Sequence, residues 1–472
     1  MRTGRAAAPA KSKRAGGADP SPFGLTVEQR MASGRVLRKA VTRSSHAKWT
    51  RASNRPEAVA LLQHADRGRL PELLPVRYGR MRVSPFAFYR GAAALMAWDL
   101  ARTPATGMRV QACGDCHLGN FGGYGSPERR LVFDINDFDE TLPAPWEWDL
   151  KRLAASIVLA GRQLGASERK CAEAAEAAAR SYRQRMREYA GMRALEAWYS
   201  RLDAEIFVHE AKSPHSRKDW QRLERNARSQ TALHVFPRIT DRVDGRPRIH
   251  DRPPLVYHPR DTGEFQREVR DIFHRYRLTL PDDRRVVLDH YHLVDVARKV
   301  VGVGSVGTRC AVALLMAGPR DPLFLQFKEA RASVLEPYAG RSRFDNHGER
   351  VVTGQRMLQA ASDVFLGWTR DDHGRDYYFR QLRDMTMKVD LDRMTKEEWL
   401  EYGQLCGWAL ARAHARAGPA ARLAGYMGKS GLFDRAIADF AVAYADQTER
   451  DHAALVKAIR SRRLPADSAA VL

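Results

Sequence analysis

Six polar side chains that could bind metal or move protons lie within residues 110–141, between apolar stretches; they are Asp115, His117, Asn120, Asp134, Asp137 and Asp139. Four residues separate Asp115 from Asn120. This spacing is typical of a phosphotransferase loop, in which the aspartate holds an acceptor hydroxyl and the asparagine binds magnesium. A second aspartate beyond a short hairpin would bind the metal that bridges the nucleotide phosphates. The segment therefore predicts half of a phosphoryl-transfer site.

A glycine-rich segment far along the chain could supply the other half. Gly302, Gly304 and Gly307 form a G-x-G-x-x-G pattern, which in dinucleotide-binding folds opens a helix and precedes an acidic residue. Here the glycines are followed by TRCAVALLMAG, an alternating run rich in strand-forming residues. A strand, a glycine loop and a strand form the element that covers ATP phosphates in kinases. We therefore expect the backbone of this loop, Ser305 included, to bind phosphates.

A lysine at the end of the next predicted strand fits the same scheme. The strand LFLQF leads to Lys328, and the corresponding lysine of a kinase-like lobe binds phosphates and pairs with a glutamate on a helix. Glu349, near the start of the helix GERVVTGQRMLQAASD, is the preferred partner, and Glu336 is the nearer alternative. A lysine can also extend along a strand end without any such role, but the neighbouring glycine loop favours phosphate binding.

Cys113, Cys116 and His117 form a C-x-x-C-H pattern, which is also the attachment motif of c-type haem. Haem attachment of that kind takes place outside the cytoplasm, and the basic N-terminal residues lack the apolar core of a secretory signal. A zinc site would need a further ligand pair, and a thioredoxin-like site would need a helix directly after the cysteines. We expect both cysteines to be small packing residues.

Composition narrows the class of protein. The chain has 472 residues, of which 44% are hydrophobic, and a net charge of +23. It has no run of apolar residues long enough to span a membrane, and its five cysteines do not suggest a disulfide framework. Its basic residues are interleaved with acidic ones and accompany no recognisable nucleic-acid module. A cytoplasmic protein is the expectation, and its positive field would suit ATP or a phosphorylated substrate.

Two motifs connect the acidic segment to a known group of enzymes. CGDCHLGNF resembles the H-G-D-x-H-x-x-N loop of aminoglycoside and choline kinases. The resemblance implies that Asp115 is the catalytic aspartate, with His117 beside it in the catalytic group, and that Asn120 binds metal. INDFDET resembles the I-D-F-D-D-A run of the same enzymes, which makes Asp137 the magnesium aspartate. Asp134 is the alternative, because it too follows an apolar strand.

The order of these motifs along the chain is reversed. In ordinary kinases the glycine loop comes first, whereas here Asp115 precedes Gly302. The helix QLCGWALARAHARAG, which contains His414, resembles the helix that directly precedes the catalytic loop in these kinases. Asp149 matches the aspartate of their downstream D-L-A motif and is expected to brace the loop. The cyclic order is kept, so the resemblance implies a circularly permuted kinase-like fold, which is tolerable because domain termini often lie close together.

The whole chain also resembles a bacterial family catalogued as domain of unknown function 2252. The shared segments are SPFAFYRG, GDCHLGNFG, LVFDINDFDETLPAPWEWDLKRLAAS, VGVGSVGTR, KEA and AVAYADQ. Two pieces of this resemblance, Tyr89–Arg90–Gly91 and Asp446–Gln447, have no role in the kinase scheme.

We therefore predict an α+β, two-lobed, protein-kinase-like fold in permuted order, with a large helical lobe and a small antiparallel-sheet lobe. The expected segments are a basic, partly disordered lead-in (1–64), the catalytic-loop half of the helical lobe (65–211), a connecting insertion (212–285), the glycine-loop lobe (286–390) and the C-terminal helices (391–472).

The predicted activity is phosphoryl transfer from ATP, with Mg²⁺, to a hydroxyl acceptor that the sequence does not identify. The partners would then be a nucleotide and an unknown small-molecule or protein acceptor. Two alternatives remain open: a kinase-like enzyme that transfers AMP, and a pseudoenzyme that binds a nucleotide or a partner without turnover.

Overall fold

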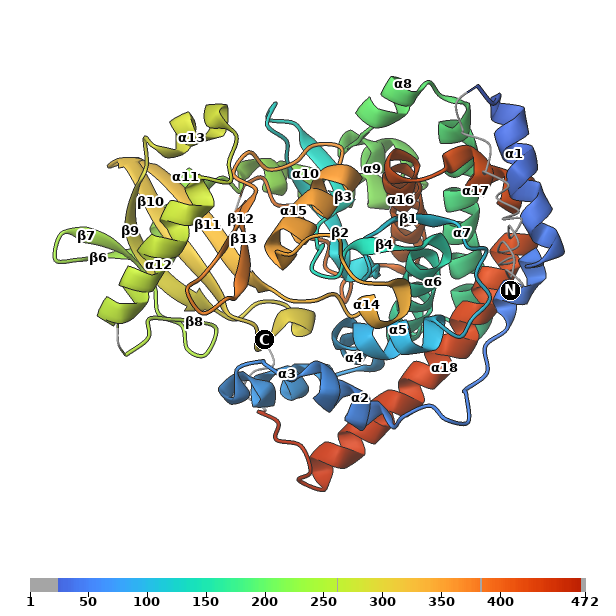
Figure 1. The fold of residues 1–472 in the computed structure, drawn as a ribbon, viewed down its shortest axis with the longest axis horizontal. Helices are drawn as coiled ribbons and strands as arrows, with labels where there is room; N and C mark the ends of the chain where they lie inside the picture. Colours follow the sequence, from blue (N-terminus) through green and yellow to red (C-terminus); the bar gives the residue numbers. More distant parts are fainter. Residues whose placement is uncertain (1–23, 261, 383, 468–472) are drawn as a thin grey trace, which may run out of the picture.

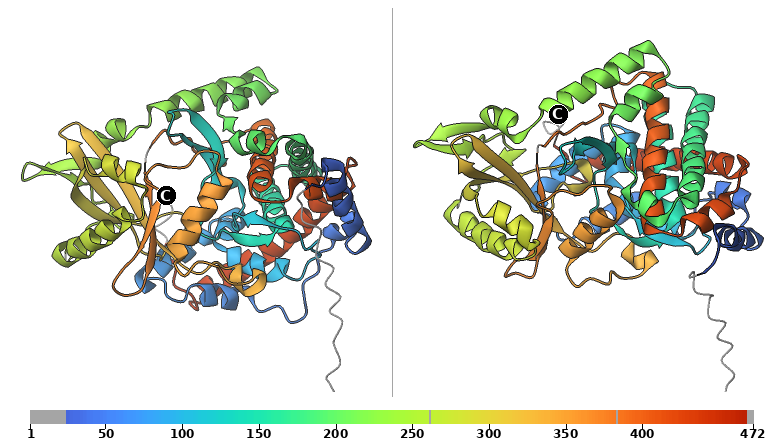
Figure 2. Two further views of the ribbon diagram at one scale, coloured as in Figure 1. Left: turned by 45° about the horizontal axis from the view of Figure 1, so that its top comes forward. Right: turned by 90° about the horizontal axis from the view of Figure 1, so that it is seen from above.

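The computed structural model describes residues 24–260, 262–382 and 384–467. Figure 1 and both views of Figure 2 show a lobe built on a large sheet beside a lobe of long helices. Each has its own hydrophobic core. This α+β architecture with antiparallel sheets confirms the predicted class. Part of the predicted lead-in, residues 1–23, lies outside the described residues.

The sheet lobe is an antiparallel sheet in the order β12-β13-β11-β10-β9-β8. Its strands are β8 (Val256–Tyr257), β9 (His292–Lys299), β10 (Cys310–Gly318), β11 (Asp321–Ala330), β12 (Gly367–Arg370) and β13 (Asp376–Gln381). Both faces of the central strands are apolar because α12 (Thr262–Arg277) covers one face and α11 (Ala232–Ile239) packs on the other. A fully covered sheet of this kind is a rigid support for groups at its edges.

The glycine loop connects two neighbouring strands of this sheet. It runs from β9 to β10 through the short turn η5 (Val303–Ser305). It does not open a helix, so the predicted strand–loop–strand arrangement is confirmed. Cys310 at the start of β10 is paired in register with Lys328 of β11. The pairing therefore places the lysine next to the end of the glycine loop.

The helical lobe is built on α6 (Trp146–Gln163), α7 (Glu168–Gly191), α16 (Lys396–Ala417), α17 (Ala420–Met427) and α18 (Leu432–Arg460). These helices pack closely because small residues line their contacts. A Cβ atom on Gly407 of α16 would lie 2.4 Å from the carbonyl oxygen of Ala178 on α7, so any larger residue would separate the two helices. The predicted C-terminal helices are confirmed.

Short strands hold the two acidic loops at the junction of the lobes. They are β1 (Arg109–Ala112), which pairs with β4 (Leu142–Pro145), and β2 (Phe121–Gly125), which pairs with β3 (Leu131–Ile135). A further strand, β5 (Leu202–Asp203), pairs with β3. The loop of residues 113–120 leaves β1, and the loop of residues 136–141 returns to β4. The β1–β4 pair therefore brings the two loops side by side.

The N-terminal helices pack against both lobes. They are α1 (Val27–Val36), α2 (Ala58–Ala65), α3 (Leu74–Met81), α4 (Pro85–Gly91) and α5 (Ala93–Leu100). The apolar spacing of SPFAFYRGAAALMAWDLA predicts one buried helix after a Ser-Pro start, but the segment is broken at Ala92 into α4 and α5. The helix α1 contacts α17, whereas α3 and α4 reach the glycine loop. One terminal segment thus contacts both lobes (Figure 1).

The segment 212–285 contains more helix than the sequence indicates. Its Arg-, Pro- and His-rich sequence predicts short extended pieces such as LHVFPRI, but this run lies in α11, whose first turn is capped by Thr231 and whose apolar face packs on the sheet. The remaining elements are η1 (Leu37–Lys39), η2 (Arg43–Ala47), η3 (Pro71–Leu73), η4 (Leu118–Asn120), α8 (Ala194–Tyr199), α9 (Glu205–Glu210), α10 (Pro214–Ser229), α13 (Asp282–Leu288), α14 (Glu336–Ala339), α15 (His347–Leu358), β6 (Thr240–Val243) and β7 (Arg246–Ile249).

A buried arginine joins the N-terminal segment to two helices. Arg55 binds Asp99 of α5 at 2.8 Å and Asp451 of α18 at 2.7 Å, and its side chain is 1% exposed. Tyr444 donates to Asp99, and Gln447 donates to Asp451. Gln447, which had no role in the kinase scheme, therefore belongs to a structural network.

Replacing Arg55 by leucine should leave two buried carboxylates without a cation. We expect the free energy of unfolding to fall by about 3–5 kcal/mol, measured by chemical denaturation. Arg51→Ala removes an exposed pair with Glu57 and should cost at most about 1 kcal/mol. Equal denaturation midpoints for the two variants would contradict the role given to this network.

Candidate functional site

The loop that carries Asp115 is fixed from beneath by Asp149 of α6. The Asp149 carboxylate accepts hydrogen bonds from the backbone N–H groups of Cys113 at 2.8 Å and Gly114 at 3.0 Å. The imidazole of His414, on α16, lies 3.2 Å from the same carboxylate. Cys113, Gly114, Asp149 and His414 are all buried in the helical lobe. Asp149 thus braces the loop, as the sequence predicts, and His414 fixes Asp149.

Both cysteines of the C-x-x-C-H pattern are packing residues. Cys113 and Cys116 are free thiols buried in the core of the helical lobe. Burial raises the pKa of both thiols, so they are not activated nucleophiles. This agrees with the expectation that they pack beside the loop.

Asp115 lies beside a buried arginine. Arg152 of α6 donates from Nε to Asp115 Oδ1 at 2.6 Å and makes a second contact through its Nη2 atom. Burial raises the pKa of the Asp115 carboxyl, and Asp137 adds to the rise, whereas Arg152 opposes it. A carboxylate whose pKa is raised in this way is a better proton acceptor than a solvated one.

His117 lies next to Asp115, with its Nε2 atom 3.8 Å from Asp115 Oδ2. Its ring is buried, and burial together with Arg90 and Arg152 lowers its pKa well below the ordinary value. The imidazole is therefore neutral near pH 7. Its Nδ1 atom has no hydrogen-bond partner among the described residues.

Two of the three metal ligands predicted from the sequence, Asn120 and Asp137, face the same small cavity. Asn120 turns its amide nitrogen to the Asp115 carbonyl oxygen at 2.7 Å, which leaves its side-chain oxygen for another partner. Asp137 lies on the neighbouring loop, and both line a cavity of about 60 Å³. Asp115, His117, Gly302, Gly304 and Ser305 line it as well. The structure thus brings the two halves of the predicted site together.

Lys328 connects the sheet lobe to the acidic loop. Its ammonium group forms an ion pair with Asp139 Oδ2. Asp139 also accepts hydrogen bonds from Ser305 Oγ at 3.0 Å and from the Tyr378 hydroxyl at 2.8 Å. Residues from the glycine loop, β11 and β13 therefore converge on one carboxylate of the helical lobe.

The two aspartates of this loop have opposite electrostatic character. Burial would raise the pKa of Asp139, but Lys328 and the hydrogen bonds from Tyr378 and Ser305 hold it below its ordinary value. Burial raises the pKa of Asp137, and the charge on Asp139 raises it further, against the influence of Lys328. The ionised form of Asp137 is thus disfavoured by its surroundings, and a bound cation would stabilise it, as expected of a metal ligand.

Two residues named from the sequence lie elsewhere. Asp134 is buried in β3, where it pairs with Arg412 of α16 and accepts backbone N–H groups from Ile135 and Ala360. Glu349 lies in the first turn of α15, and the partner of Lys328 is Asp139 instead. The helix α15 holds the loop of residues 136–141 through the next residue instead. Arg350 donates to the carbonyl oxygen of Asp139 at 2.7 Å.

Arginines from the N-terminal segment hold the glycine loop down. Arg77 donates to the carbonyl oxygens of Val303 at 2.7 Å and Gly304 at 3.1 Å, and Arg69 donates to that of Val306 at 2.7 Å. A Cβ atom on Gly304 would lie 3.1 Å from the Arg90 carbonyl oxygen. The loop therefore lies directly on α4, and glycine allows this approach.

The sequence did not single out several residues that shape the site. Asp139 was visible only as one acid of a cluster, because nothing local distinguishes it from Asp137. Arg152 lies in a segment whose sequence predicts only a helix, and Tyr378 and Arg380 lie where the sequence predicts a linker to the His414 helix. Arg380 donates to Gln326 at 2.9 Å and to the Asn136 carbonyl oxygen at 3.1 Å. Only the fold brings these side chains to the acids.

A larger cavity opens beside the small one. It has a volume of about 770 Å³ and is lined by β2, by Arg380 of β13 and by the linker after β13, residues 384–392. Its volume falls in the range of ~300–1,000 Å³ that is usual for ligand pockets. Arg90 lines both this cavity and the small one.

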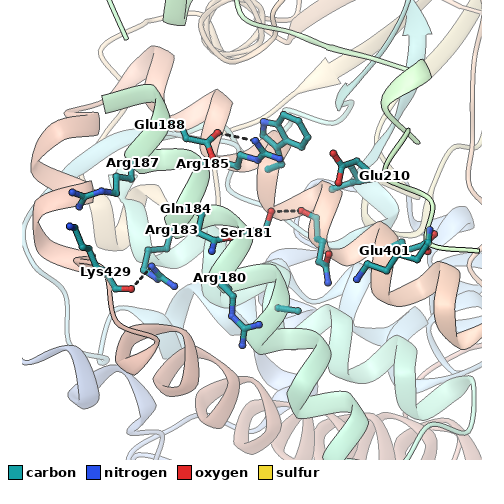
Figure 3. Close-up of a pocket in the computed structure, with 15 residues that line it drawn as sticks. Arg180, Ser181, Arg183, Gln184, Arg185, Arg187, Glu188, Glu210, Glu401 and Lys429 are labelled. Atoms are coloured by element: carbon teal, nitrogen blue, oxygen red, sulfur yellow. Dashed lines mark hydrogen bonds and ion pairs between the residues drawn. The ribbon is translucent and has the colours of Figure 1, made fainter. Parts of the chain in front are cut away.

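Another pocket, of about 840 Å³, lies on the outside of the helical lobe between α7 and α16 (Figure 3). Its arginines are partly engaged within the protein: Arg183 binds Asp434 at 2.8 Å, and Arg185 binds Glu188 at 2.9 Å. None of the predicted site residues lines it. The predicted site residues therefore lie at the junction of the lobes and not in this pocket.

A family model described as an uncharacterized protein conserved in bacteria (DUF2252) matches residues 69–458. The chain belongs to this family. The match spans both lobes, including the acidic loops, the glycine loop and Lys328. No curated protein and no solved structure matches the chain. Among the described residues, no helix has the length and apolarity needed to cross a membrane.

Asp134 and Asp137 should respond differently to loss of charge in the metal-free protein. Asp134→Asn leaves Arg412 buried without its partner and should lower the free energy of unfolding by about 3–5 kcal/mol. Asp137→Asn removes a carboxylate that burial and Asp139 disfavour, so it should leave that free energy unchanged or raise it.

The pH dependence gives the sign of this second effect. The pKa of Asp137 is raised in the folded protein, so ionisation costs stability once the pH exceeds the unfolded value of about 3.9. The advantage of Asp137→Asn over the wild type should therefore grow from pH 4 to pH 7 in denaturation experiments. A constant difference across this range would argue against the assignment.

Proposed function

We propose that this protein is an ATP- and magnesium-dependent phosphotransferase of kinase-like fold, circularly permuted, that acts on a hydroxyl acceptor. The observation that carries the proposal is the convergence of the glycine loop, Asp115, Asn120 and Asp137 on one cavity, whose lining residue Asp139 forms an ion pair with Lys328. These residues come from segments that are far apart in sequence and in two lobes. A chance resemblance of motifs gives no reason for them to meet.

The order of elements supports the permuted fold. Strand, glycine loop, strand, lysine strand, helix, two further strands, linker and the His414 helix follow one another from β9 to α16. The His414 helix then contacts the brace of the catalytic loop through Asp149. In an unpermuted kinase-like chain that helix directly precedes the catalytic loop. Here the same neighbours are adjacent in space and separated in sequence.

The donor set suits magnesium. Asn120 and Asp137 offer an amide oxygen and a carboxylate, the hard oxygen ligands that Mg²⁺ prefers, and Asp137 lies where a cation would relieve its repulsion by Asp139. Bound there with a nucleotide, Mg²⁺ would neutralise charge on the phosphates. Protein side chains and backbone amides carry out the other steps of binding and proton transfer.

The protein groups divide the other tasks as follows. Lys328 and the glycine-loop amides bind phosphates, which requires Lys328 to share its ion pair with Asp139. The larger cavity holds the rest of the nucleotide, because the small cavity of about 60 Å³ has no room for it. Asp115 orients the acceptor hydroxyl and accepts its proton, a role that its raised pKa favours.

Nucleotide binding should stabilise the folded protein. We expect ATP with Mg²⁺ to raise the melting temperature of the wild type and Lys328→Met to abolish this rise. Lys151→Met is the matched control, because Lys151 is also a buried lysine but lies in the helical lobe beside Glu147. It should keep the nucleotide-dependent rise even if its own melting temperature is lower. No rise in the wild type would refute the nucleotide site.

Asp115→Asn should bind ATP and Mg²⁺ as the wild type does and form product at least ~100-fold more slowly, since it lacks the general base. The assay is mass spectrometry of the protein and of an acceptor pool incubated with ATP, in which added phosphate and added AMP differ in mass. Asp219→Asn, a surface change on α10, is the control. Transfer of AMP, or no transfer by the wild type, would replace the proposed activity by one of its two alternatives.

A further inference from the structure

Arg90 is a cation at the centre of the site whose side chain has no hydrogen-bond partner among the residues that the structure describes. Its side chain is half-buried, and no hydrogen bond or ion pair joins it to another described residue. The atom Nε is fully buried. A buried N–H group without a hydrogen-bond partner is costly unless a ligand supplies an acceptor for it. The feature therefore points to a ligand.

The position of Arg90 identifies the kind of ligand. A Cβ atom on Gly302 would lie 3.9 Å from Arg90 Nη2, and one on Gly119 would lie 3.4 Å from Arg90 Nε. The guanidinium thus sits between the glycine loop and the loop that carries Asp115. It also lines both the small cavity and the larger one.

The backbone on both sides of Arg90 is fixed. The carbonyl oxygen of Tyr89 accepts a hydrogen bond from Arg152 at 3.0 Å, and that of Gly91 accepts one from Arg77 at 2.7 Å. The Tyr89 hydroxyl donates in turn to the Arg152 carbonyl oxygen at 2.8 Å. Two buried arginines therefore hold the residues that flank a third, and only that third guanidinium remains open to the cavity.

The nearby acids do not satisfy Arg90. Asp115 is engaged by Arg152 through two contacts, and Asp137 accepts the backbone N–H of Asp139 at 3.3 Å. Both attract Arg90 at longer range, as Asp392 does, and so they keep the guanidinium in the site without occupying its N–H groups. A planar guanidinium offers paired donors that match phosphate oxygens.

We propose that Arg90 binds the terminal phosphoryl group of the nucleotide and remains bound to it during transfer. This inference rests on the proposed function. In the step, the bond from the terminal phosphorus to its bridging oxygen breaks, and ADP leaves with the bonding electrons. The acceptor oxygen forms the new bond to phosphorus, and its proton passes to Asp115. Arg90 exchanges no proton; it offsets charge on the non-bridging oxygens. In the Tyr89–Arg90–Gly91 motif, the two flanking residues thus fix the backbone of the phosphate-binding arginine.

The test compares Arg90→Met with Arg422→Met. Arg422, on α17, is also half-buried with an unpaired Nε among the described residues, but it lies far from the cavities. By calorimetry with Mg²⁺, we expect Arg90→Met to weaken ATP binding by about 10-fold or more and ADP binding by less than about 2-fold, because only ATP carries the terminal group. The transfer rate should fall by about 10³-fold or more. Arg422→Met should change none of these quantities.

Two further measurements separate this role from a structural one. Without nucleotide, Arg90→Met should melt at the wild-type temperature or above it, because the substitution breaks no hydrogen bond or ion pair with a described residue and removes a desolvated charge. Arg90→Lys keeps the charge without the planar fork, so it should recover part of the ATP affinity.

The outcomes are distinct. If the wild type binds ATP but Arg90→Met weakens ATP and ADP equally, or neither, the Arg90 assignment fails and the proposed function stands. A lower melting temperature of nucleotide-free Arg90→Met would also overturn it, in favour of a structural role. If the wild type binds no nucleotide, the proposed function fails first.

Discussion

The ion pair between Lys328 and Asp139 is the contact on which the arrangement of the site depends. It joins a central strand of the sheet lobe to a loop of the helical lobe. Both groups are largely withdrawn from water, where an unpaired charge is expensive, so each lobe supplies what the other requires. The pair also acts on its neighbour Asp137: burial raises the pKa of that carboxyl, Asp139 raises it further, and Lys328 opposes the rise. One contact thus positions the lobes and polarises the site.

Arginine has an unusual share in the interior of this protein. Arg77, Arg152, Arg350 and Arg412 are among its largest fully buried side chains. They bind backbone carbonyl oxygens of the glycine loop and acidic loop, or the carboxylates of Asp115 and Asp134. Part of the net charge of +23 therefore lies inside the fold, where it holds loops in place. A basic composition need not indicate a nucleic-acid surface.

The sequence predicts those parts of the site that local spacing encodes. The strand–loop–strand around Gly302 follows from glycine and strand-forming residues in succession, and the brace from Asp149 follows from a motif beside the loop it holds. Contacts between distant segments cannot be predicted from local spacing in the sequence. Nothing near Lys328 names Asp139 as its partner, and Glu349 was preferred only because a helix glutamate is usual there. Similarly, LHVFPRI became helical because its apolar face packs on a sheet that its own sequence does not reveal.

The brace beneath the loop that carries Asp115 has a consequence for how the protein is made. Asp149 is fixed by His414, so the loop that carries Asp115 lacks its full support until residue 414 has left the ribosome. At 5–20 residues per second, the interval between synthesis of Asp115 and of His414 is roughly 15–60 s. During this time the buried acids and arginines of the first half of the chain are without most of their partners. Such a chain depends on late, long-range contacts, which fold slowly. The distance along the chain between this loop and its brace therefore leaves the nascent chain incompletely folded for a long time. Chaperones that shield incomplete lobes would matter more for it than for a protein whose lobes close in order of synthesis.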